Sequence, residues 1–429
     1  MGLEDRLETA LRSRHVRGNL RSIDGNMPAK HEVVDFSSND YLSLGSSQRL
    51  QETLISSLRS ASCYGPASSR LLDGNTSAHR QLEQRLCDTF NGKSALLFNS
   101  GYDANASLWS VLPCADDYVL YDEYVHASTH DGLRLSRCPK SQRQPFQHNS
   151  VLHLRQSLQS ILATSDKVRT GQADVFVAVE SLYSMDGDLA PLPDLLAAIE
   201  QELPLRNAHL MVDEAHTTGL YGPGGRGLVC HYGLAARVPL RLHTFGKSLA
   251  SNGAVLLCSP TLRRYLVNYA RPLIYSSTLS HFAIKAIDAA LTEMLAASAA
   301  RQHVLELSAR ARRQLTRLLE QPAHAERRLH LMPLCSADHL QCSPIIPILS
   351  SQPRMLAVFL QAKGLLLRPI AYPTVPIGTE RVRLCIHARN TQAQVDLLLS
   401  ALQEWLEMSP SSTPQLLSPQ NSTMREAHL

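Results

Sequence analysis

The chain has 429 residues, of which 44% are hydrophobic and 19% are charged. This length allows two or three domains, and the composition is that of a chain with a large core rather than a disordered one. The mild net charge of +4 and the scattered basic residues argue against a nucleic-acid partner, and no apolar run reaches the roughly 18 residues of a membrane span.

The first segment, residues 1–24, is predicted to form an amphipathic helix. Its apolar side chains Leu3, Leu7, Leu11 and Val16 recur at helical spacing on one stripe. The acidic start without an apolar stretch disfavours a secretory signal or a mitochondrial presequence. Nine cysteines without a CxxC pair then indicate reduced thiols rather than disulfides, and no metal site is expected.

From about residue 46 to 275, helical stretches alternate with short strands. The strand candidates are Ser94–Phe98, Tyr118–Tyr121, Asp174–Glu180, His209–Asp213, Arg241–Phe245 and Ala254–Cys258. Several are continuous apolar runs, as strands buried on both faces require. This alternation predicts an α/β fold with a mostly parallel sheet covered by helices.

A long helical stretch over about 280–320 is followed by the pattern of a second, smaller α/β domain. Its strand candidates are Pro344–Leu349, Leu365–Pro369 and Arg383–Ile386, with helical patterns near 353–363 and 391–407. We therefore expect an N-terminal helix and arm (1–45), a large domain (46–277), a small C-terminal domain (278–408) and a disordered, Ser- and Pro-rich tail (409–429).

The tail ends in Ala427-His428-Leu429. This small–basic–leucine tripeptide is of the same type as the S-K-L peroxisomal address, which an import receptor reads. We expect a peroxisomal location if the tripeptide is used and a cytoplasmic one if the match is due to chance.

Ligands of parallel α/β sheets bind beyond the carboxyl ends of the strands, so polar residues that follow the strand candidates are candidates for a binding site. After the first strand candidate, Asn99–Asn105 places Gly101 at the start of a helix, where bare N–H groups favour a phosphate. An ordinary glycine turn is the alternative.

Asp213 ends an apolar strand, where a carboxylate is poorly solvated unless it meets a cation such as a protonated pyridine nitrogen. His216 is placed to hydrogen-bond a hydroxyl of the same ring. The alternative is that Asp213 caps a helix and that His216 is an ordinary loop histidine.

Lys247 also follows a strand, and its neighbours are mainly small or apolar in a chain with only seven lysines. A desolvated lysine has a lowered pKa and is a good amine nucleophile for Schiff-base chemistry. Thr244 can offer a hydroxyl to a phosphate, and His126 can lie flat on a planar ring. A surface lysine and a structural histidine are the alternatives.

One cofactor, pyridoxal 5′-phosphate (PLP), would use all of these groups. It needs a helix start that binds its phosphate, here called the phosphate cradle, an acid at its ring nitrogen, a hydrogen-bond partner for its ring hydroxyl, and a lysine that forms a Schiff base. The glycine run Gly222–Gly227 matches a dinucleotide-binding pattern by its letters alone. No strand directly precedes it and no acidic residue lies about 20 residues further on, so NAD binding is not expected.

These segments resemble those of the α-oxoamine synthases, which are PLP-dependent transferases of fold type I. The resemblance runs from Asp35 to Leu406. It is carried by Phe36–Leu42, Ser69–Asn75, Asn99–Asn105, Ser184–Asp188, Asp213–His216, Thr244–Lys247, Pro373–Pro376 and Arg381–Leu384. The family implies a large PLP domain with a mostly parallel seven-stranded sheet between helices, a small C-terminal α/β domain, and a homodimer with a shared active site.

The resemblance also implies residue roles. Lys247 would bind the cofactor and later take a proton, Asp213 would pair with the ring nitrogen, and His126 would stack on the ring. The remaining implied contacts are His216 and Ser184 at the ring hydroxyl, Gly101, Tyr102, Thr244 and the partner-facing Ser277 at the phosphate, Arg383 and Asn39 at the amino-acid carboxylate, and Thr374 and Arg21 at the acyl substrate. Ala250 stands where family members often have glycine.

The implied reaction is a decarboxylative condensation of an acyl-CoA with an amino acid, with pimeloyl-CoA and L-alanine as the expected pair. A sister activity with another pair is the main alternative, such as glycine C-acetyltransferase, 5-aminolevulinate synthase or a secondary-metabolite acyltransferase. Serine palmitoyltransferase is disfavoured by the lack of a membrane segment, and an ordinary aminotransferase by the Ser184–Asp188 and Asp213–His216 segments together. A non-catalytic partner subunit would be expected to lack Lys247, which is present.

Overall fold

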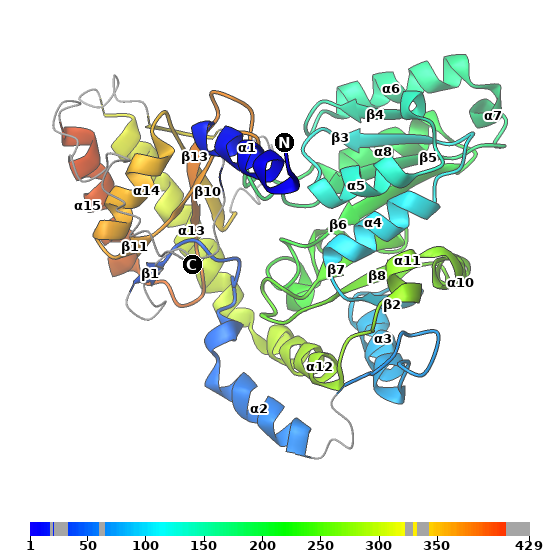
Figure 1. Ribbon diagram of the computed structural model, residues 1–429, viewed down its shortest axis with the longest axis horizontal. Coiled ribbons are helices and arrows are strands. Elements are labelled where there is room, and N and C mark those ends of the chain that lie inside the picture. The colour runs from blue at the N-terminus through cyan, green and yellow to red at the C-terminus, as the bar shows by residue number, and fades with distance from the viewer. Residues whose placement is uncertain (18–19, 21–32, 60–64, 322–328, 333–342, 409–429) are drawn as a thin grey trace.

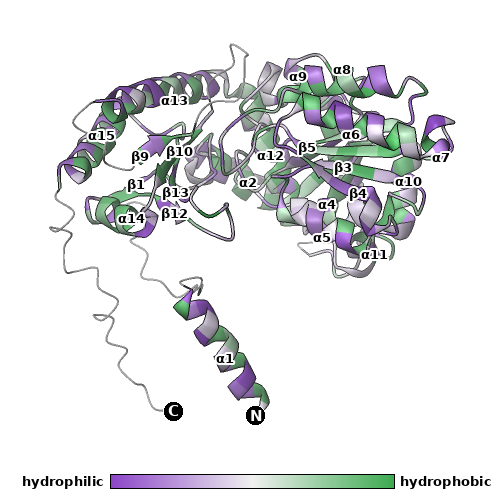
Figure 2. Ribbon diagram, turned by 90° about the horizontal axis from the view of Figure 1, so that it is seen from above, coloured by the Kyte–Doolittle hydropathy of each residue, from purple (hydrophilic) through white to green (hydrophobic). Residues whose placement is uncertain are grey.

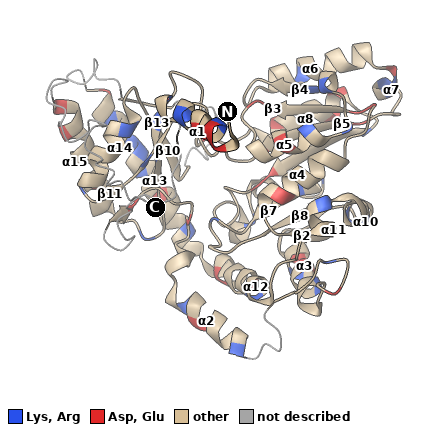
Figure 3. Ribbon diagram, viewed as in Figure 1, with Lys and Arg blue, Asp and Glu red and all other residues tan. Residues whose placement is uncertain are grey.

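The computed structural model describes residues 1–17, 20, 33–59, 65–321, 329–332 and 343–408. It contains two bodies, each built on its own sheet (Figure 1). Within the described ranges, none of the helices combines the length and the apolarity that crossing a membrane requires. Lys and Arg are spread over both bodies and are not massed on one element (Figure 3).

The larger body contains a seven-stranded sheet. Across the sheet the strands are β2 (Ser94–Phe98), β8 (Ala254–Cys258), β7 (Leu240–Thr244), β6 (Ala208–Asp213), β5 (Val175–Glu180), β3 (Tyr118–Asp122) and β4 (Arg143–Phe146). Strand β8 is antiparallel to both of its neighbours, and the other pairs are parallel. The predicted fold class, with its mostly parallel sheet, is confirmed.

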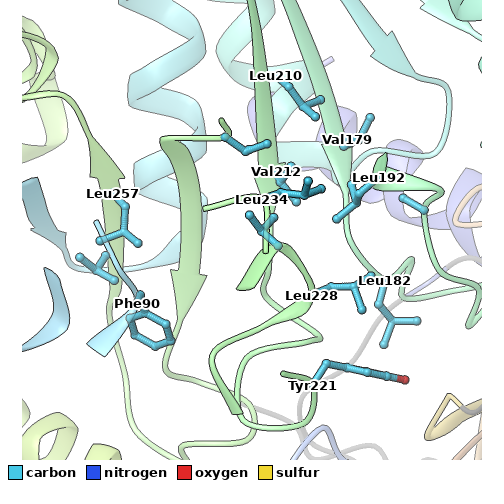
Figure 4. Close-up of a cluster of buried hydrophobic side chains, with 14 of the residues drawn as sticks. Phe90, Val179, Leu182, Leu192, Leu210, Val212, Tyr221, Leu228, Leu234 and Leu257 are labelled. Atoms are coloured by element: carbon cyan, nitrogen blue, oxygen red, sulfur yellow. The ribbon is translucent and has the colours of Figure 1, made fainter. Parts of the chain in front are cut away.

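Helices cover both faces of this sheet. One face packs against α3 (Ser77–Thr89), α6 (Val151–Thr164), α8 (Leu192–Glu202) and α12 (His281–Ala296), and the other against α4 (Gly101–Val111), α5 (Ala127–Leu135) and α10 (Pro260–Tyr269). Strand β2 shows why two cores form: Ala95 and Leu97 point into the first, while Leu96 and Phe98 point into the second. Figure 4 shows part of the first core.

Short helices complete this body, namely α7 (Asp166–Arg169), α9 (Leu228–His231) and α11 (Arg271–Tyr275). The run Gly222–Gly227 forms a loop with a short 3₁₀ turn at Pro223–Gly225. It follows β6 only after a stretch of turns. The structure thus agrees with the interpretation of this run as a loop.

The smaller body has a four-stranded antiparallel sheet in the order β12 (Arg368–Ile370), β13 (Arg381–Cys385), β10 (Ile345–Ser350) and β9 (Leu329–Leu331). Helices α13 (Ser298–Leu319), α14 (Pro353–Ala362) and α15 (Gln392–Glu407) pack around its core. The arm joins this body, because β1 (Val34–Asp35) pairs in parallel with β11 (Leu365–Leu366).

Two predicted helices differ from the observed ones. The stretch 280–320 is two helices, α12 and α13, which meet at Ala297. The N-terminal helix α1 covers only Leu3–Val16, and residues 21–24 of that prediction lie outside the described residues. The apolar side chains of α1 are all exposed, and the helix stands clear of both sheets (Figure 2).

The domain boundaries remain a prediction. Buried side chains of α12, such as Ile287 and Leu291, belong to the core of the large sheet, although α12 lies beyond the expected boundary at residue 277. Helix α2 (Gln48–Arg59) packs against α12. The tail 409–429, with Ala427-His428-Leu429, lies outside the described residues.

Candidate active site

The carboxyl ends of β5, β6 and β7 bring three ionisable side chains to one edge of the large sheet. Glu180 ends β5 and Asp213 ends β6, and these two residues are paired in the sheet register. Lys247 follows the end of β7 by three residues. Parallel strands therefore place an amine and two carboxyl groups at the edge where α/β sheets bind ligands.

Burial and charge set the protonation of this cluster. Burial lowers the pKa of Lys247 to about 8, against the opposing charges of Asp213 and Glu180. Burial, together with the charge of Asp213, raises the pKa of Glu180 to about 8. Near neutral pH, Glu180 is therefore largely protonated, and the Lys247 amine loses its proton much more readily than an exposed lysine does, which suits a nucleophile or a base.

The Asp213 carboxylate is held in a fixed orientation. Asn105 Nδ2 donates to its Oδ2 at 2.9 Å, and the backbone N–H of Ala215 donates to Oδ1 at 2.9 Å. The same amide nitrogen of Asn105 lies 3.1 Å from Ser128 Oγ. A buried and oriented carboxylate of this kind suits the protonated ring nitrogen that the sequence predicts as its partner.

His126 lies at the start of α5 and is exposed. Its Nδ1 lies 2.8 Å from Ser128 Oγ, and its backbone N–H donates to Glu180 Oε1 at 2.6 Å. The ring of Tyr102 meets it edge-on, with centroids 6.4 Å apart. The imidazole is thus oriented by Ser128, and the backbone of His126 is held against Glu180.

The start of α4 has the features of a phosphate cradle. A Cβ atom on Gly101 would come within 2.4 Å of Thr244 Cγ2, so only glycine lets the helix start approach Thr244 this closely. Thr244 Oγ1 is buried and has no hydrogen-bond partner among the described residues. A hydroxyl without a partner beside bare helix N–H groups is what a phosphate oxygen would satisfy, so these residues fit PLP.

A guanidinium from the smaller body reaches this edge of the large sheet. Arg383 on β13 is 8% exposed, and it donates to Asn39 Oδ1 and, at 3.0 Å, to the backbone carbonyl of Ser184. After burial, its positive charge also contributes to lowering the pKa of Lys247, so the two cations lie close enough to repel each other. Arg383 and Asn39 therefore meet at this edge, and their predicted role at a substrate carboxylate, for which a guanidinium is well suited, remains a prediction.

Other predicted residues lie at the margin of the site. Ser184 meets Arg383 through its backbone carbonyl. Tyr102 is exposed and its hydroxyl donates to Asp131. Ser277 is exposed, and its carbonyl accepts from Asn99 Nδ2 at 2.8 Å, next to the cradle.

Two predicted acyl-substrate contacts are not brought to the cluster. Thr374 is exposed in a bend after the cis Tyr372–Pro373 bond, and among the described residues no hydrogen bond joins it to the groups above. Arg21 lies outside the described residues. Both remain sequence-based predictions.

Sequence reasoning missed Glu180, Asn105 and Tyr41 as individual site residues. Glu180 ends a buried strand as Asp213 does, so the rule that selected Asp213 could also have selected it. Asn105 lies one turn inside α4 and touches Asp213 only through the packing of α4 on the sheet. Tyr41 OH lies 2.8 Å from His216 Nδ1, a contact between residues 175 positions apart that no local pattern reveals.

Comparison with known proteins identifies the family to which the chain belongs. The family model "Aminotransferase class I and II" matches residues 31–402. The chain therefore belongs to this family of fold-type I, PLP-dependent transferases, and within it to the α-oxoamine synthases. It is 42% identical to the 8-amino-7-oxononanoate synthase of Emericella nidulans over 94% of this chain and 96% of that one.

Other relatives show the breadth of the group. The aminoacyl transferase sphA of Byssochlamys spectabilis is 32% identical, over 92% of this chain and 86% of its own. The structure of serine palmitoyltransferase from S. paucimobilis, with a bound PLP–myriocin aldimine, superposes with a TM-score of 0.78 at 24% identity over 94% of this chain and 98% of that one. This structural likeness shows the shared fold.

Proposed function

We propose that this enzyme condenses pimeloyl-CoA with L-alanine to give 8-amino-7-oxononanoate, coenzyme A and carbon dioxide, a step of biotin biosynthesis. The proposal is carried by the 42% identity to the Emericella synthase, which extends over almost the full length of both chains. The buried Arg383–Asn39 pair beside Lys247 supports it, because an amino-acid carboxylate needs a cation at this place.

The chain's own residues divide the work as follows. Arg383 and Asn39 bind the carboxylate of the amino acid and so fix its α-carbon near Lys247. The uncharged Nζ of Lys247 takes the α-proton, for which a pKa of about 8 is well matched to neutral pH. Bound PLP supplies the electron sink that stabilises the resulting carbanion. Holding the acyl thioester against that carbon makes the attack effectively intramolecular.

The site is completed by a second copy of the chain in this proposal. Ser277 is exposed next to Asn99 and the phosphate cradle, so its hydroxyl is available to a partner subunit. The neighbouring Tyr275 is 72% exposed and Phe282 is 48% exposed. Large apolar side chains around a polar contact are typical of a subunit interface, and a homodimer is the expected assembly.

A sister activity is the second candidate function. The 32% identity to the sphA aminoacyl transferase over 92% of this chain favours it as the alternative, because two differently named enzymes match nearly the same residues. In that case the same Lys247, Asp213 and Arg383 would serve another acyl-CoA or amino acid. The difference between the two functions would then lie in the acyl pocket.

A substrate panel separates the two. Purified enzyme is given pimeloyl-, acetyl-, succinyl- and palmitoyl-CoA, each with alanine, glycine or serine, and release of coenzyme A is measured. The proposal expects the highest kcat/KM for pimeloyl-CoA with alanine. A higher value for another pair would overturn the substrate assignment, and Lys247→Ala serves as the inactive control.

A peroxisomal location is proposed from the sequence alone, through an import receptor that reads Ala427-His428-Leu429. A fluorescent protein fused in front of residues 409–429 tests it in fungal cells. Punctate peroxisomal fluorescence that becomes diffuse when the last three residues are deleted would support import. Diffuse fluorescence of both fusions would contradict it.

A further inference from the structure

Tyr41 connects the arm to the centre of the active site. Its carbonyl accepts from the backbone N–H of Ala388, which follows β13 of the smaller body, at 2.8 Å, while its side chain packs in the core of the large sheet. Its side chain is fully buried, and its hydroxyl lies 2.8 Å from Nδ1 of His216, which follows β6 of the larger body. This hydrogen bond is therefore one of the contacts between the two bodies, together with the bonds that Arg383 and Arg381 make to Ser184 and Asp186.

The direction of this hydrogen bond follows from the surrounding groups. Burial raises the pKa of the Tyr41 phenol well above its ordinary range, so the oxygen carries a proton. Burial, with the positive charges of Lys247 and Arg383, lowers the pKa of His216 well below its ordinary range, so the imidazole is neutral. A neutral imidazole has one N–H, and its other nitrogen can only accept.

Asn39 is the competing acceptor for the phenolic proton. Its Oδ1 lies 3.3 Å from Tyr41 OH and already accepts from the Arg383 guanidinium. His216 Nδ1 is nearer, at 2.8 Å, and is the acceptor without a charged donor. The phenol therefore donates to Nδ1, which leaves the ring proton on Nε2. Among the described residues, Nε2 of His216 has no hydrogen-bond partner.

We infer that Tyr41 is a positioning residue that holds His216 as the Nε2–H tautomer, so that the imidazole donates a hydrogen bond toward the ring hydroxyl of bound PLP. The inference rests on the proposed role of His216, and it gives the arm a direct part in arranging the site. A hydrogen bond that fixes the tautomer of a site histidine is a common way to orient its other ring nitrogen toward a ligand.

Tyr41→Phe removes the hydroxyl and keeps the ring, and Tyr265→Phe is a matched control. Tyr265 donates to the backbone carbonyl of Val111 at 2.9 Å, outside the site. Loss of the donor at Tyr41 leaves His216 free to exchange tautomers. We expect a changed ratio of the two absorption bands of the resting holoenzyme, which report the protonation of the ring hydroxyl, and no change in Tyr265→Phe.

Kinetics give a second readout. One buried hydrogen bond corresponds to about a three- to tenfold lower kcat in Tyr41→Phe. The KM for the amino acid should stay near the wild-type value, because the Arg383–Asn39 contact is retained. A merely structural role would instead lower thermal stability and leave the band ratio unchanged, which would overturn the inference.

The wild-type enzyme provides a test that does not depend on how well the variant folds. In ¹⁵N-histidine NMR of the holoenzyme, the resonance that disappears in His216→Asn should report a proton on Nε2. A proton on Nδ1 would overturn the inference. Neither the NMR spectrum nor the band ratio requires a substrate. Both expected results can therefore be refuted without affecting the proposed reaction. A wild-type enzyme without PLP bands would overturn both proposals together.

Discussion

The buried ion pair between Arg381 and Asp186 offers a sharp test of how the smaller body is tied to the site. Arg381 Nη1 lies 2.7 Å from Asp186 Oδ1, and the two side chains are 1% and 10% exposed. The guanidinium also donates to the carbonyls of Met185 at 2.9 Å and Thr379 at 2.8 Å. Replacing Arg381 by Met would leave the carboxylate buried without a counter-charge.

Breaking a buried pair in this way costs about 3–5 kcal/mol of unfolding free energy, whereas an exposed pair is worth about 0–1 kcal/mol. Arg237 and Glu200, which are 49% and 48% exposed, are the matched surface pair. Urea unfolding should therefore show a large loss for Arg381→Met, a small one for Arg237→Met, and substantial recovery in Arg381→Met with Asp186→Leu. Equal losses for the two single variants would refute the reasoning.

Three further predictions concern the site. Gly101→Ala should weaken PLP binding about 10- to 100-fold, measured by cofactor loss on dialysis, because the new Cβ would clash with Thr244 Cγ2. Adding Thr244→Ser to the same chain should restore binding. Unchanged retention of PLP by Gly101→Ala would contradict the role of the α4 start as the phosphate cradle. Ala250 is exposed and has a φ of +47°, which strains a residue with a Cβ, so Ala250→Gly should stabilise the protein by about 1 kcal/mol. Ala299→Gly in the helix α13 is the control and should destabilise the protein. Equal effects of the two substitutions on thermal unfolding would be inconsistent with backbone strain at Ala250. Burial raises the pKa of Glu180 from 4.5 to about 8, so between these pH values the folded apoenzyme holds a proton that the unfolded chain has lost, and its free energy of unfolding should fall as the pH rises. Glu180→Gln should flatten this fall. An unfolding profile with the same pH dependence in wild type and variant would contradict the raised pKa of Glu180.

Much of the large sheet can be predicted from the sequence, because its strands are apolar runs and apolar runs must be buried. The predicted strands at 94–98 and 254–258 have the bounds observed for β2 and β8. Strand β4 was missed because Arg143–Phe146 is a short, polar edge strand with a proline, which carries little hydrophobic signal. The break between α12 and α13 at Ala297 was missed because alanine gives no stop signal.

The site residues also fall into those that the sequence predicts and those that depend on tertiary contacts. Lys247 and Asp213 could be predicted because each follows a strand, and strand order brings them to one edge. Tyr41 could not be selected, since its role depends on the arm crossing from the smaller body to His216. The exposure of Leu7 and Leu11 on α1 was equally beyond a helical pattern, which predicts an apolar stripe but not what covers it.

The central claim is that Lys247 carries PLP within hydrogen-bonding distance of the groups around Asp213. Reduction of the purified enzyme with borohydride, followed by peptide mass spectrometry, tests this claim most directly, because reduction makes a lysine–PLP linkage permanent. The account predicts one phosphopyridoxyl group on the peptide that contains Lys247. A label on any other lysine, or no label on a folded and active enzyme, would contradict it.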